Sequence, residues 1–223
     1  MTHCSLNKPS ASFAHKMKIR WDFEDNLDTE KAKYSIENAK NITDIAPIMD
    51  IILQVYVYEN DFKTPLKLLT DIEKKILSHQ SSLNAKDYYI GLLHDFMGNK
   101  QLAVSFYRSA LEILEKRLNE NIGDAMLHAA ISRVYLQLGL LEDALKSAQL
   151  SVALVPPSRD AWYGIVNKTN LAFIYLSSDL INDAIHTLKE VYNKPFGPTK
   201  NQLLLYWEWS GLQNNSNFIT IIN

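Results

Sequence analysis

The segment Ile131–Pro156, with the sequence ISRVYLQLGLLEDALKSAQLSVALVP, decides the fold. A small residue follows the apolar Ile131, and an aromatic ring stands four residues after it. Gly139 comes next, and glycine often ends a helix because it takes the left-handed backbone conformation without steric cost. Small residues then recur at helical spacing, beginning with Ala144. The segment therefore predicts two antiparallel helices joined by a tight turn.

The same spacing of residues occurs three times in the chain. Counted from a first apolar residue, a small residue stands at +1, a ring at +4 and a turn-forming residue at +8, followed by an alanine at +13 and packing residues at +17 and +20. We call this the seven-position pattern. It is met by Ile90, Gly91, His94, Gly98, Ala103, Tyr107 and Ala110; by Ile131, Ser132, Tyr135, Gly139, Ala144, Ala148 and Ser151; and by Leu171, Ala172, Tyr175, Asp179, Ala184, Leu188 and Val191.

Weaker copies precede these three. One comprises Ile52, Leu53, Tyr56, Asn60, Pro65, Leu69 and Ile72. Proline replaces the alanine there, and we expect Thr64 to cap that helix with Pro65 in its first turn, where proline costs little. Further back, Ala32, Ile36 and Ala39 match a second helix alone, and its partner helix would fall across Phe13–Phe23 and is poorly formed. Residues 21–44 are therefore predicted to form a degenerate half repeat.

This pattern resembles the tetratricopeptide repeat (TPR), whose period is about 34 residues. Here Ala103, Ala144 and Ala184 lie 41 and 40 residues apart, and we expect the extra residues to lengthen helices or connectors. The resemblance implies an all-α fold, a right-handed superhelix of antiparallel helical hairpins with a C-terminal capping helix. The repeats would span 45–198, at about 45–82, 84–123, 124–160 and 161–196.

Two shorter stretches resemble a narrower group. Trp21-Asp22-Phe23 followed by Ala32 and Ala39 is similar to the repeats in the helical tails of some bacterial winged-helix regulators. The chain's last residues are similar to the closing pattern of those tails and of tails on bacterial serine/threonine kinases, through Trp209, Leu212, Phe218, Ile221 and Ile222. At the acidic, proline and arginine positions of that pattern the chain has Asn215, Ser216 and Asn217.

The composition excludes several function classes. Only seven of the 223 residues are glycine, and no two are spaced for a phosphate-binding loop, which favours an all-helical chain. A formal net charge of −2 provides no positive field for nucleic acid or anionic lipid. The single cysteine, Cys4, excludes an intramolecular disulfide and suits a reducing compartment, so we expect a cytoplasmic protein.

The first twenty residues are basic and carry no apolar core of a signal peptide, so we expect residues 1–20 to be a disordered tail. No apolar run elsewhere is long enough to span a membrane. None of the six histidines has a metal-binding spacing, and no serine stands in a plausible Ser-His-Asp arrangement. We therefore expect no membrane partner, no cofactor, no metal and no enzymatic activity.

The concave groove is the candidate site, because the first helices of stacked hairpins line it. Arg133 is the one cation placed there, and we expect it to anchor an acidic group of a partner. Asp50, Gln54, Tyr88, Leu92 and Ala129 occupy the slots where heat-shock chaperone binders carry Lys and Asn, which excludes a carboxylate clamp. The candidate partner-binding residues are Tyr58, Tyr88, Leu92, Phe96, Arg133, Gln137, Thr169 and Phe173.

These features predict a non-catalytic protein–protein interaction scaffold or regulatory module that binds a partner peptide or helix. The alternative is the sensor or regulatory region of a bacterial signalling protein, whose kinase, cyclase or winged-helix part is absent from this chain.

A second alternative concerns the C-terminus. Residues 199–223, with Thr199 as a helix cap, are expected to close the core against Leu171–Leu176 and Ile181–Val191. They could instead fold back into the groove as an occluding peptide that makes the protein autoinhibited.

Overall fold

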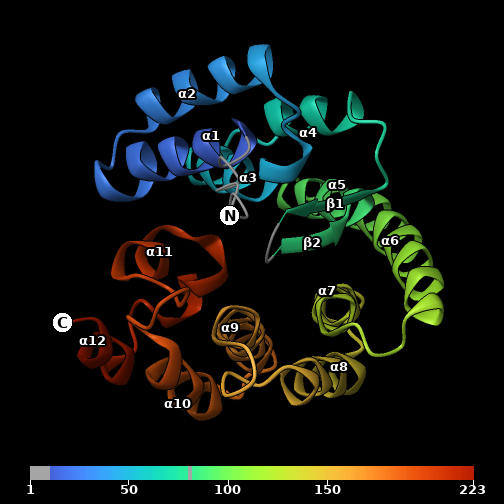
Figure 1. Cartoon of the computed structure of the whole chain (residues 1–223), viewed down its shortest axis with the longest axis vertical. Coiled ribbons are helices and arrows are strands. Elements are labelled where there is room, and N and C mark those ends of the chain that lie inside the picture. The colour runs from blue at the N-terminus through green and yellow to red at the C-terminus, as the bar shows by residue number, and fades with distance from the viewer. Residues whose placement is uncertain (1–10, 80–81) are drawn as a thin grey trace, which may run out of the picture.

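The computed structural model describes residues 11–79 and 82–223 (Figure 1). Within these residues the chain is helical apart from one β-hairpin, so the all-α prediction is confirmed in its main part. The α-helices are α1 (Ala11–Arg20), α2 (Thr29–Ile42), α3 (Met49–Tyr58), α4 (Lys63–Thr70), α5 (Lys86–Phe96), α6 (Lys100–Glu120), α7 (Ala125–Gln137), α8 (Leu141–Leu154), α9 (Ala161–Ser177), α10 (Ile181–Val191), α11 (Lys200–Leu205) and α12 (Ser216–Ile222).

Three short helices of other types complete the helical elements. They are the π-helical η1 (Trp21–Asp25) and the 3-10 helices η2 (Ala46–Ile48) and η3 (Trp207–Leu212). No described helix has both the length and the apolar character needed to cross a bilayer.

The helices of the four complete copies of the pattern pack as consecutive pairs, α3 with α4, α5 with α6, α7 with α8 and α9 with α10. The turn in each pair contains one residue in the left-handed conformation. These residues are Asn60 (φ 58°), Gly98 (φ 81°), Gly139 (φ 76°) and Asp179 (φ 62°). They are the four residues at +8 of the seven-position pattern, so the predicted turns are confirmed.

Small residues lie where the helices of a pair approach most closely. Ala103, Ala144 and Ala184 are all buried. A Cβ atom built on Gly91 of α5 would lie 2.6 Å from the ring of Tyr107 of α6, closer than packed atoms come. In this pair the +1 position is therefore a close contact between the two helices, and the +13 position is buried.

The prediction of a disordered tail is wrong for residues 11–20, which form α1. Residues 1–10, with Cys4, lie outside the described part of the chain. α1 continues into η1, and both pack on α2. Ile19 and Phe23 are buried in the same apolar cluster as Ala32, Ile36 and Ala39.

The half repeat predicted over 21–44 is consequently a complete hairpin, which starts at Ala11. Its members Ile19, Arg20, Phe23, Leu27, Ala32, Ile36 and Ala39 have the spacing of the seven-position pattern. Leu27 occupies the turn position with φ 54°. The sequence indicated only a poorly formed first helix over Phe13–Phe23, whereas the structure has helix from Ala11 to Asp25. The pattern is weak there because leucine rarely takes the left-handed conformation and arginine is not small.

A two-stranded antiparallel hairpin corrects the expectation of an entirely helical chain. Strands β1 (Ile76–His79) and β2 (Ser82–Ala85) pair with Ile76 opposite Ala85 and Ser78 opposite Leu83. Leu77 and Ala85 are buried, and the hairpin contacts η2, α5, α6 and α7. It occupies the connection between α4 and α5.

The cap of α4 also differs from the expectation. The helix begins at Lys63, and the Asp61 carboxylate accepts hydrogen bonds from the backbone N–H groups of Lys63 and Thr64, both at 3.1 Å. Asp61 therefore caps the helix in place of Thr64. Pro65 still lies in the first turn and is buried.

The C-terminal elements return to the beginning of the chain. In Figure 1 the chain runs around the view from α2 to α12, and α11 lies beside the N-terminal helices, where it contacts η1. Leu203, Trp209, Leu212, Phe218 and Ile222 are buried in one apolar cluster with residues of α9 and α10. Thr199 caps α11 through a capping box with Gln202. The last segment thus packs on α9 and α10 and also reaches η1.

Candidate functional site

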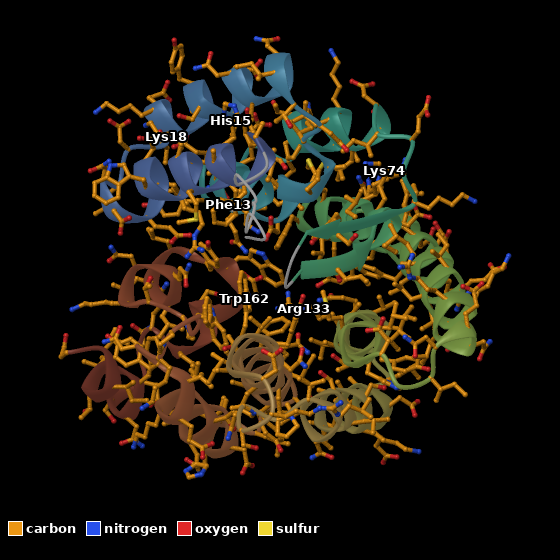
Figure 2. All side chains as sticks on the ribbon, in the orientation of Figure 1. Phe13, His15, Lys18, Lys74, Arg133 and Trp162 are labelled. Atoms are coloured by element: carbon orange, nitrogen blue, oxygen red, sulfur yellow. The ribbon has the colours of Figure 1, made fainter. Side chains whose placement is uncertain are left out.

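The candidate site is the face that the first helices of the hairpins share. These first helices are α1 with η1, α3, α5, α7 and α9. Three consecutive residues of the C-terminal segment, Tyr206–Glu208, lie against this face and are called the insert below. Arg133 of α7, the predicted anchor, lies near the middle of the molecule (Figure 2).

Arg133 is held by residues of α9, α5 and the insert. Its Nε donates a hydrogen bond to Oδ1 of Asn170 on α9 at 2.6 Å. The guanidinium carbon lies 5.0 Å from the centre of the Phe173 ring, within the range of a cation–π contact. NH1 lies 3.5 Å from Oε1 of Glu208, and the guanidinium also lies near the Tyr88 hydroxyl. The acid that meets the predicted cation therefore belongs to this chain.

Glu208 receives a second donor from α3. Nε2 of Gln54 lies 2.8 and 3.1 Å from the two carboxylate oxygens. The Glu208 side chain is 10% exposed and that of Arg133 is 25% exposed. A carboxylate so far removed from water needs such donors, since an unpaired buried charge is costly.

The neighbouring Trp207 is surrounded by aromatic rings. It meets Phe96 of α5 edge-on with ring centres 5.4 Å apart, and Phe173 of α9 edge-on at 5.7 Å. Phe96 in turn stacks on Phe62. Edge-on rings are a favourable arrangement of the ring quadrupoles, so the face provides an aromatic slot beside the cation.

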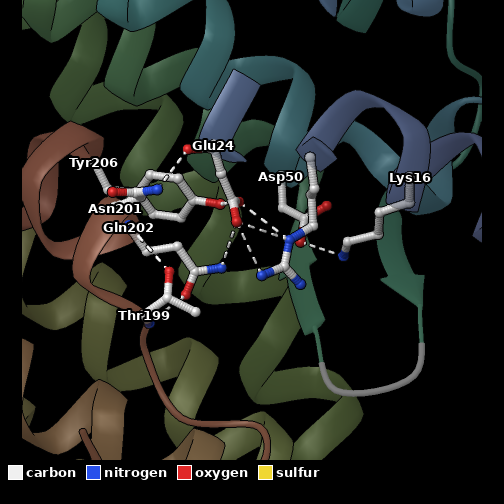
Figure 3. Close-up of polar contacts among 8 residues, drawn as sticks. Lys16, Glu24, Asp50, Thr199, Asn201, Gln202 and Tyr206 are labelled. Atoms are coloured by element: carbon white, nitrogen blue, oxygen red, sulfur yellow. Dashed lines mark hydrogen bonds and ion pairs between the residues drawn. The ribbon is translucent and has the colours of Figure 1, made fainter. Parts of the chain in front are cut away.

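Tyr206 joins the insert to the N-terminal hairpin. Its hydroxyl donates to the buried carboxylate of Glu24, which also accepts from Arg20 at 3.1 Å and from Gln202 at 3.0 Å (Figure 3). The side chain of Asn201 donates to the backbone oxygen of Glu24 at 2.8 Å. Burial, reinforced by the charge of Glu24, raises the pKa of Tyr206 well above its usual value.

The structure places the predicted site residues in three different environments. Arg133, Phe96 and Phe173 meet at the insert. Tyr88 and Leu92 are buried. The Tyr88 hydroxyl lies near the Arg133 guanidinium, and burial raises the pKa of Tyr88 to about 12 although the positive charge of Arg133 opposes the shift.

The remaining three predicted residues lie apart from the insert contacts described above. The exposed Tyr58 packs on Phe23, the half-buried Thr169 donates to the backbone oxygen of Ile165, and Gln137 is half-buried.

Sequence reasoning missed five contributors, namely Glu24, Asn170, Tyr206, Trp207 and Glu208. One signal was available for the last. Glu208 is the one charged residue after Lys200, and it stands between two tryptophans in an apolar segment. An acid in that setting calls for a cationic partner, and Arg133 was already identified as a cation on the opposing face.

The described residues contain no group of three His, Cys, Asp or Glu side chains placed to hold a metal ion. Around the insert the site groups guanidinium, side-chain amide, carboxylate and aromatic groups. No protein-family model and no curated protein matches the chain.

Proposed function

We propose that this chain is a non-catalytic protein-interaction module, a scaffold or regulatory component whose hairpins form a right-handed TPR-like superhelix. It binds a peptide or helix of a protein partner on the face shared by the first helices. The observation that supports this most is Arg133, a largely buried cation placed beside Phe173 and facing a carboxylate. A cation on an aromatic face is suited to an acidic group of a peptide.

The proposed setting is the cytoplasm, with a protein partner and no direct role for nucleic acid or membrane. The near-neutral net charge and the single cysteine support it. A heat-shock chaperone tail is not the proposed partner, because Gln54 and Tyr88 stand where a carboxylate clamp needs other residues.

The test compares partner capture by the full-length protein and by Arg133→Gln. Loss of a charge-assisted contact, about 1.5–3 kcal/mol, is expected to lower partner affinity by roughly 10- to 150-fold. Arg108→Gln is the matched control, because Arg108 is exposed on α6. Circular dichroism must show that both variants are folded. Equal recovery of every partner by Arg133→Gln and wild type overturns the proposal.

A second candidate is the regulatory region of a bacterial signalling protein. It is favoured because Trp209, Leu212, Phe218 and Ile222, which carry the resemblance to regulator and kinase tails, are buried together against α9 and α10. A kinase, cyclase or DNA-binding protein captured by wild type and lost with Arg133→Gln supports this candidate. An unrelated class of partner with the same dependence favours the general scaffold.

A further inference from the structure

We infer that the insert Tyr206–Glu208 is a resident ligand of the first-helix face, and that a partner displaces it with a segment in which an aromatic residue is followed directly by an acid. The inference rests on the proposed function, since it names the ligand class and the regulation of the same face. It chooses between the two roles that the sequence left open for the C-terminus.

The first argument is the set of helices that the insert reaches. Tyr206 contacts Glu24 of η1, Trp207 contacts Phe96 of α5 and Phe173 of α9, and Glu208 contacts Gln54 of α3 and Arg133 of α7. Three consecutive residues thereby engage the first helix of every hairpin. Contact with every first helix is what a peptide lying across stacked hairpins would make.

The second argument concerns which ligand can replace the insert. Arg133 and Gln54 both point donors at the Glu208 carboxylate. Nε of Arg133 is already bonded to Asn170, so NH1 is the donor directed at the acid. If Glu208 leaves, the largely buried guanidinium loses its counter-charge, and only another anionic group restores it. The slot between Phe96 and Phe173 likewise selects an aromatic side chain.

The third argument is the difference between the insert and its flanks. Leu203 and Trp209, which flank the insert, are fully or almost fully buried, whereas Tyr206 and Trp207 are only half-buried. The described contacts of the insert with the first helices are made by side chains. Its backbone bonds stay local, from Tyr206 N–H to Gln202 and from Trp209 N–H to Tyr206. Releasing the insert therefore disrupts no described backbone ladder of the hairpins.

The test uses a fluorescent synthetic peptide with the sequence of residues 199–212 as the probe. Full-length wild type, whose face is occupied, is expected to bind it weakly. The full-length variant Trp207→Ala/Glu208→Gln, whose own insert no longer fills the slot, is expected to bind it at least tenfold more tightly. A control peptide with the same two replacements should not bind, and the variant should remain monomeric in light scattering.

The matched control protein is Trp21→Ala/Glu37→Gln, which makes the same chemical changes at exposed positions away from the slot. It should bind the probe as weakly as wild type does. If the folded insert variant binds the probe no better than wild type, the inference is overturned. Concentration-dependent dimers of wild type that exchange their inserts also overturn it, because the ligand would then be a second copy.

Hydrogen exchange on the wild type keeps the inference testable if the insert variant does not fold. Amides of residues 206–208 are expected to exchange by local opening, at least tenfold faster than those of α9. If the amides of residues 206–208 and those of α9 exchange only through global unfolding, the insert does not open on its own. That result overturns the inference. The peptide assay needs no cellular partner. Its failure is therefore distinct from a failure of the Arg133-dependent capture that tests the proposed function.

Discussion

The hairpin α7–α8 and the N-terminal hairpin formed by α1, η1 and α2 have the same plan and different sequences. Both bury an alanine at +13, Ala144 in one and Ala32 in the other. Both turn through a left-handed residue at +8, Gly139 in one and Leu27 in the other. At +1, however, the α7–α8 hairpin has the small Ser132, whereas the N-terminal hairpin has Arg20.

The departures in the N-terminal hairpin coincide with its contacts to the C-terminal segment. Arg20 forms an ion pair with Glu24, and Glu24 accepts hydrogen bonds from Gln202 and Tyr206. The α7–α8 hairpin has Leu136 at the position of Glu24, five residues after the start of the pattern. The pattern thus records packing within a hairpin, and it is relaxed where a hairpin also meets another segment.

The largest expected effect is at Glu24. Glu24→Leu gives the N-terminal hairpin the residue type found in α7, and it removes the acceptor of three side chains. We expect a loss of about 3 kcal/mol in the free energy of unfolding, because one partner of a buried ion pair remains uncompensated. Urea unfolding measures it. Asp25→Leu, at the next and exposed position, should stay within about 0.5 kcal/mol of wild type, and an equal loss in both variants contradicts the assigned role of Glu24.

The next prediction tests whether the two hairpins are equivalent inside. Ala144→Leu and Ala32→Leu each overfill a site with no exposed surface, so each should cost about 1–3 kcal/mol. Thermal or urea unfolding of both variants checks it. An unchanged stability for Ala32→Leu alone would show that the N-terminal pair does not pack as a full repeat.

The parts of the fold that sequence could predict are those set by local rules. Turns at Gly98, Gly139 and Asp179 follow from backbone sterics, and the buried alanines follow from helical spacing. The first N-terminal helix was not predictable by the same rules, because Leu27 and Arg20 violate them. Its stability comes from tertiary packing of Ile19 and Phe23, which outweighs local preference.

The candidate site was predictable only on one side. Arg133 could be placed from the register of its helix, but its partner lies 75 residues away in the chain. Pairing over such a distance depends on how far the hairpins curve around, and no local pattern encodes that curvature.

Alkaline pH should weaken the N-terminal contact more than the α7 region. Burial and Glu24 raise the pKa of Tyr206, and burial and Glu115 raise the pKa of Tyr135 to about 12. Above pH ~10 the unfolded chain loses these protons while the folded protein keeps them. Stability therefore falls with rising pH, by at most about 1.4 kcal/mol per pH unit for each tyrosine.

Urea unfolding between pH 9 and 11.5 separates the two tyrosines. Tyr206→Phe should clearly reduce the slope with which the free energy of unfolding falls as the pH rises. Tyr135→Phe should flatten it less, because its hydroxyl contact with Glu115 is exposed to solvent and screened. An identical decline in wild type and Tyr206→Phe would mean that the hydroxyl of Tyr206 is already solvated in the folded protein.

The smallest effects are expected at the two turns, and they should have opposite signs. Gly139 has φ 76° and open space around the position of a Cβ atom, so Gly139→Ala tests the backbone conformation alone. We expect a loss of about 1 kcal/mol, because the left-handed conformation is unfavourable for alanine. Leu27 has φ 54° and is 65% exposed, so Leu27→Gly relieves strain and removes little packing. It should gain about 0.5–1 kcal/mol after the greater chain entropy of unfolded glycine is included. Urea unfolding of both variants measures the pair of effects. A loss of stability in Leu27→Gly would show that the leucine side chain makes a contact worth more than its backbone strain, and that the two turns are alike in shape only.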